Sequence, residues 1–396
     1  MREERDADGD GRAEIVTFYA GEVPLRQEAD TTGDGIADTR LVYENGRKAT
    51  QTEDRNADGE PDVRYAFDAD GEIAEESADA DFDGRFEALS VYEAGVLRER
   101  RVDSTGQGTP DRIEFFEQGV LTRVELDRNQ DGRVDVWSDY DADGRLTARR
   151  EDTTESGQPD RWLTFDPESG EATLIESDTT GDGVRDTRRI AGSDGVAIRI
   201  EEDRNADGAV DYTVFFEAGV AARYEADRDF DGRIDGRGAL DAEGRATVTE
   251  RDTTGDGQTD VRATFEGELQ TLEERDTRAD GAFDVVTHFE AGSRVRQEID
   301  STADGAFDTV LFFEGERLAQ QERDTTGDGR ADEKILYDQN ERPSREEFDT
   351  NADGQPDLVK LYTEGVLTRE ETDADFDGRS EQVSTFVGGV VAGTQT

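Results

Sequence analysis

The sequence predicts an all-β fold, an elongated tandem array of about sixteen β-hairpins arranged as a solenoid or superhelical β-meander. Three observations predict it. A unit of 24 to 26 residues recurs along all 396 residues, each unit begins with a short acidic loop, and each loop is followed at once by a run rich in β-branched and aromatic residues. A repeat of this period indicates one supersecondary unit stacked many times, so residues 1–396 form a single repeat array.

The acidic loop is nine residues long and has a fixed pattern. Its first residue is aspartate and its sixth is glycine in every unit, the fifth is aspartate in all but two, and the ninth is always aspartate or glutamate. The loops therefore start at Asp6, Asp30, Asp54, Asp79, Asp103, Asp127, Asp152, Asp178, Asp203, Asp227, Asp252, Asp276, Asp300, Asp324, Asp349 and Asp373.

Short oxygen-bearing side chains at alternate positions curl around one point, and a glycine at the sixth allows the sharp turn that a hard cation needs. Calcium accepts six to eight oxygens in irregular geometry, so it suits these loops better than magnesium. We expect about 13 to 16 calcium ions per chain, held by side chains at loop positions 1, 3, 5 and 9. The predicted ligands are Asp6, Asp8, Asp10, Glu14, Asp30, Thr32, Asp34, Asp38, Asp54, Asn56, Asp58, Asp62, Asp79, Asp81, Asp83, Glu87, Asp127, Asn129, Asp131, Asp135, Asp178, Thr180, Asp182, Asp186, Asp203, Asn205, Asp207, Asp211, Asp227, Asp229, Asp231, Asp235, Asp252, Thr254, Asp256, Asp260, Asp300, Thr302, Asp304, Asp308, Asp324, Thr326, Asp328, Asp332, Asp349, Asn351, Asp353, Asp357, Asp373, Asp375, Asp377 and Glu381.

The loops are not expected to be equal. Those starting at Asp6, Asp79, Asp227 and Asp373 have acidic residues at all four ligand positions and should bind most tightly. Three other loops depart from the pattern and should bind weakly or stay empty. Their departures are Gln107 and Ser156 at the fifth position, and Arg278, a cation, at the third.

The first half of the loop is similar to an EF-hand, but its twelfth position lacks the bidentate glutamate of that motif, holding Leu41, Tyr65 or Val214 instead. The chain resembles bacterial tandem calcium-binding proteins with the repeat Asp-x-Asp-x-Asp-Gly-x-x-Asp. Its loops are similar to those of FG-GAP and thrombospondin type 3 repeats, in which the loop closes on its ninth residue and leads on without a helix. The Phe-Gly signature that flanks FG-GAP loops is not evident here, so the resemblance does not imply a propeller.

Each loop is expected to lead into a hairpin. The fifth residue after the loop is aromatic in fourteen units, a glycine-containing turn follows, and a second strand alternates arginine with glutamate. Rings in register are expected to form the spine of a continuous core. They are Tyr19, Tyr43, Phe67, Tyr92, Phe116, Tyr140, Phe165, Phe216, Phe265, Phe289, Phe313, Tyr337, Tyr362 and Phe386.

A longer period is superimposed on the unit. Loops of the Asp-Thr-Thr-Gly class, at Asp30, Asp178, Asp252 and Asp324, recur at every third unit when the similar Asp-Ser-Thr-Gly loop at Asp103 is counted with them. Duplication of a three-unit block and three units per superhelical turn both account for this. A closed β-propeller is the alternative fold, although a three-unit period does not divide sixteen.

The formal charge of −55, from 101 acidic and 46 basic residues, favours cations and basic surfaces as partners and argues against nucleic acid. No stretch approaches the length of a membrane span. The chain has no cysteine and one histidine, His288, which is expected to be an ordinary strand residue. No acidic residue differs from its counterparts in other units, so the sequence does not predict an enzyme.

Two functional classes fit these features. The first is a calcium-stabilised extracellular structural protein, a rod, a stalk or the subunit of a self-assembling filament. The second is a calcium-dependent adhesin that binds carbohydrate or protein. Millimolar external calcium suits low-affinity loops, which favours an extracellular or cell-surface location.

The two ends of the sequence predict a way in which copies associate. Residues 1–5 resemble the tail of a second hairpin strand, while residues 386–392 are apolar where their equivalents carry arginine and glutamate. Because open strand edges pair with other strands, we expect head-to-tail self-association, with the apolar strand docked on the opposite end of a second copy.

Overall fold

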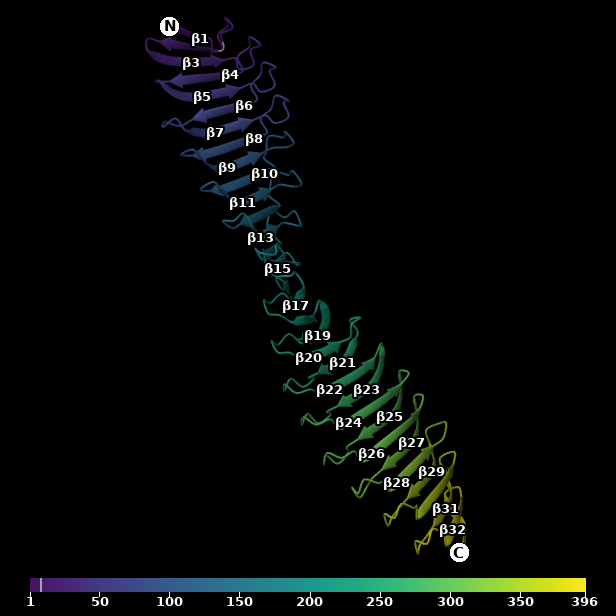
Figure 1. The fold of residues 1–396 in the computed structure, drawn as a ribbon. Helices are drawn as coiled ribbons and strands as arrows, with labels where there is room; N and C mark the ends of the chain where they lie inside the picture. Colours follow the sequence, from purple (N-terminus) through teal and green to yellow (C-terminus); the bar gives the residue numbers. More distant parts are fainter. Residues whose placement is uncertain (8) are drawn as a thin grey trace. The chain divides into compact units, whose positions relative to one another are not determined.

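The computed structural model describes residues 1–7 and 9–396, and over these it contains strands, turns and bends only. The chain divides into two units, Met1–Ala197 and Ile198–Thr396, and each contains eight of the acidic loops. In each unit every strand is antiparallel to its neighbours and the strands follow chain order, as Figure 1 shows. The predicted all-β array is confirmed.

The first unit contains strands β1 to β16, which pair consecutively. They are β1 (Arg2–Arg5), β2 (Ile15–Ala20), β3 (Val23–Ala29), β4 (Thr39–Glu44), β5 (Arg47–Glu53), β6 (Val63–Phe67), β7 (Ile73–Ala78), β8 (Ala88–Glu93), β9 (Val96–Val102), β10 (Arg112–Glu117), β11 (Val120–Leu126), β12 (Val136–Tyr140), β13 (Leu146–Glu151), β14 (Arg161–Phe165), β15 (Ala172–Ser177) and β16 (Thr187–Ala191).

The second unit is built in the same way, from β17, which begins at the boundary, to β33. Its strands are β17 (Ala197–Glu202), β18 (Tyr212–Glu217), β19 (Val220–Ala226), β20 (Gly236–Leu240), β21 (Ala246–Arg251), β22 (Val261–Glu266), β23 (Leu269–Arg275), β24 (Val285–Glu290), β25 (Ser293–Ile299), β26 (Thr309–Glu314), β27 (Arg317–Arg323), β28 (Glu333–Tyr337), β29 (Pro343–Phe348), β30 (Leu358–Thr363), β31 (Val366–Thr372), β32 (Gln382–Val387) and β33 (Val390–Gln395).

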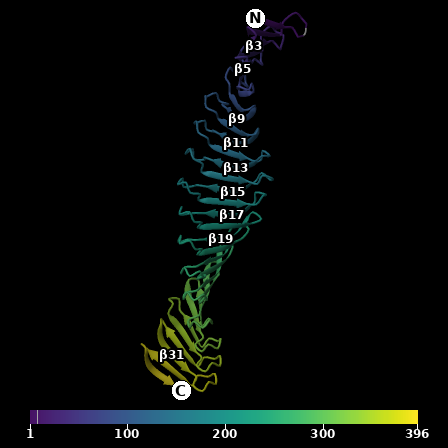
Figure 2. The ribbon, with the colours of Figure 1, turned by 90° about the vertical axis from the view of Figure 1, so that its left-hand side faces the viewer.

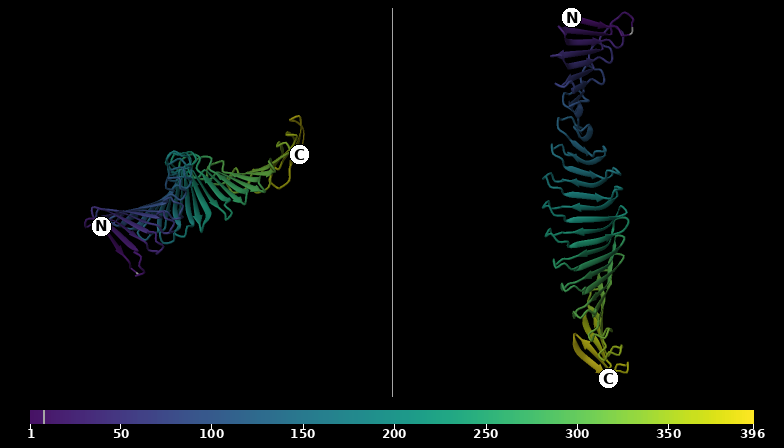
Figure 3. Two further views of the ribbon diagram at one scale, coloured as in Figure 1. Left: turned by 90° about the horizontal axis from the view of Figure 1, so that it is seen from above. Right: turned by 60° about the vertical axis from the view of Figure 1, so that its left-hand side comes forward.

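The sheet of each unit is open, so the alternative of a closed propeller is wrong. Over the part of the chain that is described, β1 pairs with β2 alone and β33 with β32 alone, and within each unit the strands pair in succession along the chain. Figures 2 and 3 show this single layer of strands from other sides. Two kinds of connection alternate along the chain, a nine-residue acidic loop and a short turn, so the loops lie along one edge of each sheet and the turns along the other.

The short turns confirm the predicted hairpins. At Asn45–Gly46 and Ala94–Gly95 both central residues have positive φ, at 50° and 78° and at 51° and 74°. This is the turn whose twist matches that of antiparallel strands. Near these turns the strand pairing also shifts by one residue; in the hairpin of β2 and β3 the shift falls between Phe18 and Tyr19, shortly before the turn.

The predicted continuous aromatic core is wrong, because a single layer leaves both faces of each sheet open to solvent. The fourteen rings are half-buried rather than enclosed. Among the described residues the one ring pair in contact is Tyr212 and Tyr224, at 5.7 Å, whereas arginines cover many rings. The Arg223 guanidinium, for example, lies 3.5 Å from the centre of the Phe215 ring. Buried apolar residues are few: Leu41, Val63, Val124, Val136, Leu163, Ala191, Ala226, Ala263 and Val359.

The strand faces carry the expected cross-strand ion pairs. Arg262 on β22 lies 2.9 Å from Glu250 on β21 and 3.5 Å from Glu274 on β23. His288 is part of this pattern, since its Nε2 lies 3.1 Å from the Glu298 carboxylate on β25, as expected of a strand residue. Pairs this exposed contribute about 0–1 kcal/mol each, so they do not replace a core.

Candidate metal-binding loops

The most buried polar side chains of the protein are aspartates at loop positions 1 and 9. In contrast to the few buried apolar residues, they recur in loop after loop. They are Asp38, Asp62, Asp79, Asp127, Asp135, Asp152, Asp160, Asp186, Asp203, Asp211, Asp227, Asp260, Asp276, Asp284, Asp300, Asp332, Asp357 and Asp373. Burying a carboxylate is costly unless hydrogen bonds or a cation compensate, so the contacts of these groups decide what the loops do.

The first aspartate holds the turn of its own loop. In every loop its Oδ2 accepts a hydrogen bond from the amide of the glycine at position 6, at distances from 2.6 Å at Gly157 to 3.0 Å at Gly305. Position 6 requires a glycine, because φ is near 90° there in all sixteen loops, as at Gly183, and side chains disfavour that conformation. The conserved spacing of aspartate and glycine thus has a local structural cause.

The ninth residue closes the loop from the other side. Its carboxylate accepts from the amide of position 2 in every loop, and often from that of position 3, as Asp186 accepts from Thr179 at 2.5 Å and from Thr180 at 2.9 Å. The strand begins at the next residue, so the loop ends at its ninth position as expected, without a helix.

A hydroxyl group at position 2 reinforces this closure, and the sequence analysis missed it. Wherever serine or threonine stands there, its hydroxyl donates to the carboxylate of position 9; Thr31 donates to Asp38 at 2.7 Å. This hydrogen bond, opposed by burial, is the main reason that the pKa of Asp38 lies below its ordinary value. The recurrence of these hydroxyls was the available signal: Thr31, Ser104, Thr153, Thr179, Thr253, Thr277, Ser301, Thr325 and Thr350.

The structure brings the predicted acidic ligands together. One carboxylate oxygen from each of Asp79, Asp81, Asp83 and Glu87 lies within 4.8 Å of the others, and the loop at Asp373 repeats this arrangement. Groups of three acids form in the same way in the loops at Asp6, Asp30 and Asp178, and three further groups exist among the described residues. Asp8 lies outside the described residues.

Residues at position 3 differ by type. Threonines face the first carboxylate, with Thr180 Oγ1 3.5 Å from Asp178. Asn205, in contrast, accepts from the amide of Asp207 at 3.0 Å and donates to its carboxylate at 2.9 Å. With an aspartate at position 3, burial and then the charge of Asp231 raise the pKa of Asp229 above its ordinary value. In the loop at Asp227 this is a repulsion that a bound cation would relieve.

The donor set fits a hard cation, and two orphaned atoms add to this. Asp186 and Asp260 are only 3% and 2% exposed, and the Oδ1 of each has no hydrogen-bond partner although Oδ2 has several. A buried carboxylate oxygen without a partner is a cost that a bound cation removes. These Asp-rich clusters are therefore suited to hold metal ions, with ligands that are all oxygen.

Two of the three loops expected to be weak have lost an acid at position 5, and the structure shows where the replacement goes. The Gln107 amide donates to Gln130 of the next loop at 3.0 Å, so it points out of its own loop. Ser156 stays in place and accepts from the amide of Gln158 at 3.2 Å, as aspartate does elsewhere. Both loops keep the bonds from position 1 to the glycine, to Gly108 and Gly157.

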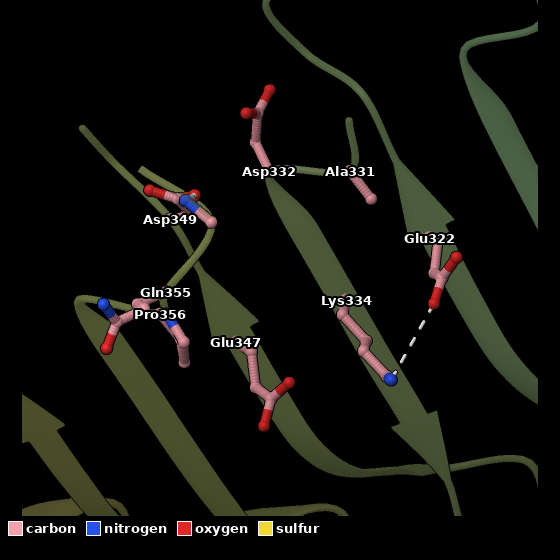
Figure 4. Close-up of a pocket in the computed structure, with 9 residues that line it drawn as sticks. Glu322, Ala331, Asp332, Lys334, Glu347, Asp349, Gln355 and Pro356 are labelled. Carbon is pink, nitrogen blue, oxygen red and sulfur yellow. Dashed lines mark hydrogen bonds and ion pairs between the residues drawn. The ribbon is translucent and has the colours of Figure 1, made fainter. Parts of the chain in front are cut away.

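Consecutive loops are linked through their backbones. The amide of the first aspartate of a loop donates to the carbonyl oxygen of the ninth residue of the loop before, as Asp349 does to Asp332 at 2.8 Å. Figure 4 shows these two residues beside a hollow of about 200 Å³ between neighbouring loops, with Lys334 lower in it, 3.8 Å from Glu322. The hollow is open and mixed in charge, and we assign it no role.

Comparison with known proteins leaves the family open. No family model matches the chain, and no curated protein matches it. Similar solved structures include TcdB2-TccC3, with 11% identity, a TM-score of 0.19 and coverage of 100% of this chain and 25% of that one. Another is a Tc holotoxin pore of Photorhabdus luminescens, with 14% identity, a TM-score of 0.19 and coverage of 94% and 25%.

This chain spans about a quarter of the length of those solved chains. With TM-scores this low the structures do not superpose as wholes, so nothing known of those proteins is transferred to this one. The protein is a tandem β-hairpin array with repeated Asp-rich clusters suited to metal ions. Among the described residues no helix has the length and apolar character needed to cross a membrane.

Proposed function

We propose that this chain is a calcium-stabilised structural protein of the cell exterior, working as a rod, a stalk or the subunit of a filament. The observation that carries the proposal is the burial of loop carboxylates in a fold that has very few buried apolar residues. In such a fold the loops, rather than an apolar core, supply the interactions that each hairpin needs to stay in place.

The metal we propose is calcium. All candidate ligands are carboxylate, hydroxyl or amide oxygens on a flexible nine-residue loop, and hard cations with many oxygen ligands prefer this set. Magnesium demands a compact octahedron and retains its waters, which suits a crowded loop of several carboxylates less well. Thiolate is absent from a chain without cysteine, which removes the ligand that softer metals favour.

A structural role follows from where the ions would act. Where carboxylates lie within 4.8 Å of one another they repel, so the closed form of such a loop is less stable until a cation neutralises it. The loop joins two strands and its ninth residue contacts the next loop, so closing it fixes the spacing of neighbouring hairpins. Metal binding is thereby coupled to folding along each unit.

The location we propose is the cell exterior. Position 3 is threonine or asparagine in many loops, which leaves three carboxylates there instead of four. Fewer charged ligands lower the affinity, and calcium sites of external modules bind at about 10⁻⁴–10⁻³ M. Sites of this affinity stay filled outside the cell.

The test is a calcium titration of the whole chain. Equilibrium dialysis with elemental analysis should give several calcium ions per chain, and magnesium at equal concentration should not replace them. Thermal melting followed by circular dichroism should show a large fall in the melting temperature after chelation, while small-angle scattering should show a modest expansion as the loops loosen. A chain whose melting and scattering are unchanged by chelation would contradict the proposal.

A further inference from the structure

One loop has a cationic side chain at a predicted ligand position. Arg278 occupies position 3 of the loop at Asp276, where other loops have an oxygen-bearing side chain. Its Nη1 lies 3.5 Å from Oδ2 of Asp284, the ninth residue of the same loop. The same nitrogen lies 3.8 Å from Oδ2 of Asp300, the first residue of the next loop, and Nη2 donates to the carbonyl oxygen of Asp300.

The two carboxylates that face this guanidinium are buried, with side chains 4% and 8% exposed, while Arg278 itself is 32% exposed. Two buried carboxylates without a cation would repel, and each would lack compensation for leaving water. A guanidinium stays charged at any physiological pH and directs several N–H donors at once. It therefore supplies the charge and the contacts that an ion supplies in an ordinary loop.

The loop otherwise has the architecture of its neighbours. Asp276 accepts from the amide of Gly281 at 2.7 Å, and Asp284 accepts from the amide of Thr277 at 3.0 Å. Its connection to the following loop is stronger, because the usual backbone bond from Asp300 to Asp284, at 2.9 Å, is joined by the contacts of Arg278. The arginine is thus accommodated in a closed loop rather than excluded from it.

We propose that Arg278 is a tethered cation that takes the place of a metal ion in the loop 276–284 and fastens it to the loop at Asp300. The loop then closes without metal, and it stays closed and in contact with the loop at Asp300 when calcium is withdrawn. The inference rests on the proposed function only in that the other loops take calcium.

The first test removes the charge without calcium. In wild-type protein with excess chelator, hydrogen exchange should find the amide of Gly281 more strongly protected than that of Gly257, which lies at the same position of the loop at Asp252 and is held by its hydrogen bonds alone. R278Q should raise the exchange rate of Gly281 by about tenfold or more, because two buried carboxylates lose their cation. Equal rates in R278Q and wild type would overturn the inference.

The second test returns an oxygen to the ligand position. R278D gives the loop four acids, as in the loops at Asp79 and Asp373, and should bind one more calcium ion per chain than wild type at saturation. The control is R330D, the same charge change at the exposed seventh position of the loop at Asp324, which should keep the wild-type count. An unchanged count in R278D would overturn the exchange of one cation for the other.

These tests separate the two proposals. A wild-type chain that binds no calcium would defeat the proposed function, whereas the exchange comparison between wild type and R278Q is made in chelator and still decides the role of Arg278.

Discussion

The carboxylate at position 9 of a loop holds the loop closed and offers an oxygen to a cation. One pair of substitutions at this position separates the two functions. Asp260 is 2% exposed, and its Oδ2 accepts from the amides of Thr253 and Thr254, at 2.5 and 2.9 Å, and from the Thr253 hydroxyl at 2.8 Å. Its Oδ1 has no partner. One oxygen thus holds the loop closed, while the other is available to a cation.

Asp260→Ala removes both functions. The Thr253 hydroxyl can turn to water, but two amides lose a charged acceptor at about 1.5 kcal/mol each, so local stability should fall by about 3 kcal/mol even without metal. That corresponds to roughly 100-fold faster exchange of amides in β21 and β22. Asp260→Asn keeps one oxygen for the amides and should cost about 1 kcal/mol, yet its NH₂ replaces the oxygen available to the cation.

The assay is hydrogen exchange in chelator combined with calcium counting at saturation. Both variants should lose one ion per chain, whereas only the alanine variant should show the large rise in metal-free exchange. Glu268→Ala, the same loss of charge on an exposed turn between β22 and β23, is the control and should change neither quantity. Metal-free exchange at the wild-type rate in Asp260→Ala would refute the claim that this carboxylate closes the loop.

Three further predictions follow from the same contacts. The pKa of Asp38 is lower in the folded chain than in the unfolded chain, where it is about 3.9. The stability that this carboxylate contributes is therefore complete above about pH 3.9 and is lost as the pH falls through the folded pKa. Metal-free circular dichroism should show unfolding confined to that acid range and no change between about pH 5 and 7. Gly238→Val should cost about 1–3 kcal/mol in denaturant unfolding, because a Cβ there would lie 2.3 Å from the Tyr224 ring, and a wild-type midpoint would contradict this. Tyr362→Phe removes a 2.7 Å hydrogen bond to Glu346 and should lower stability by about 1 kcal/mol, with unchanged melting as the contrary result.

The loops were predictable because their interactions are local. Asp178 bonds to Gly183 five residues on, and Asp186 to Thr179 seven residues back, so one nine-residue segment contains nearly everything that shapes it. The turns were predictable for the same reason, since Asn45–Gly46 needs only its own positive φ values. The role of the hydroxyl at position 2 was equally local and was overlooked.

Features that depend on neighbouring strands could not be predicted in this way. The alternation of strand residues indicated a buried face, but whether a second layer covers that face is a tertiary property, and here each unit has one layer. The rings therefore do not pack against one another, and some of them lie under a cationic side chain, as Phe313 lies 3.7 Å from the Arg294 guanidinium. The orientation of the Arg278 side chain could not be predicted either, because one of the two carboxylates that it faces, that of Asp300, belongs to the next loop.

The sequence by itself determined the number of loops, the acidic residues that gather in them and the β-structure that follows each loop, since short-range hydrogen bonds and backbone preferences act within one unit. Only the tertiary structure decided that loop carboxylates, rather than aromatic rings, are the groups most withdrawn from solvent. The reason is that burial depends on what lies across a sheet face or beside a loop end: an uncovered face leaves the rings half-buried, whereas the first and ninth residues of a loop are covered although the rest of the loop is exposed.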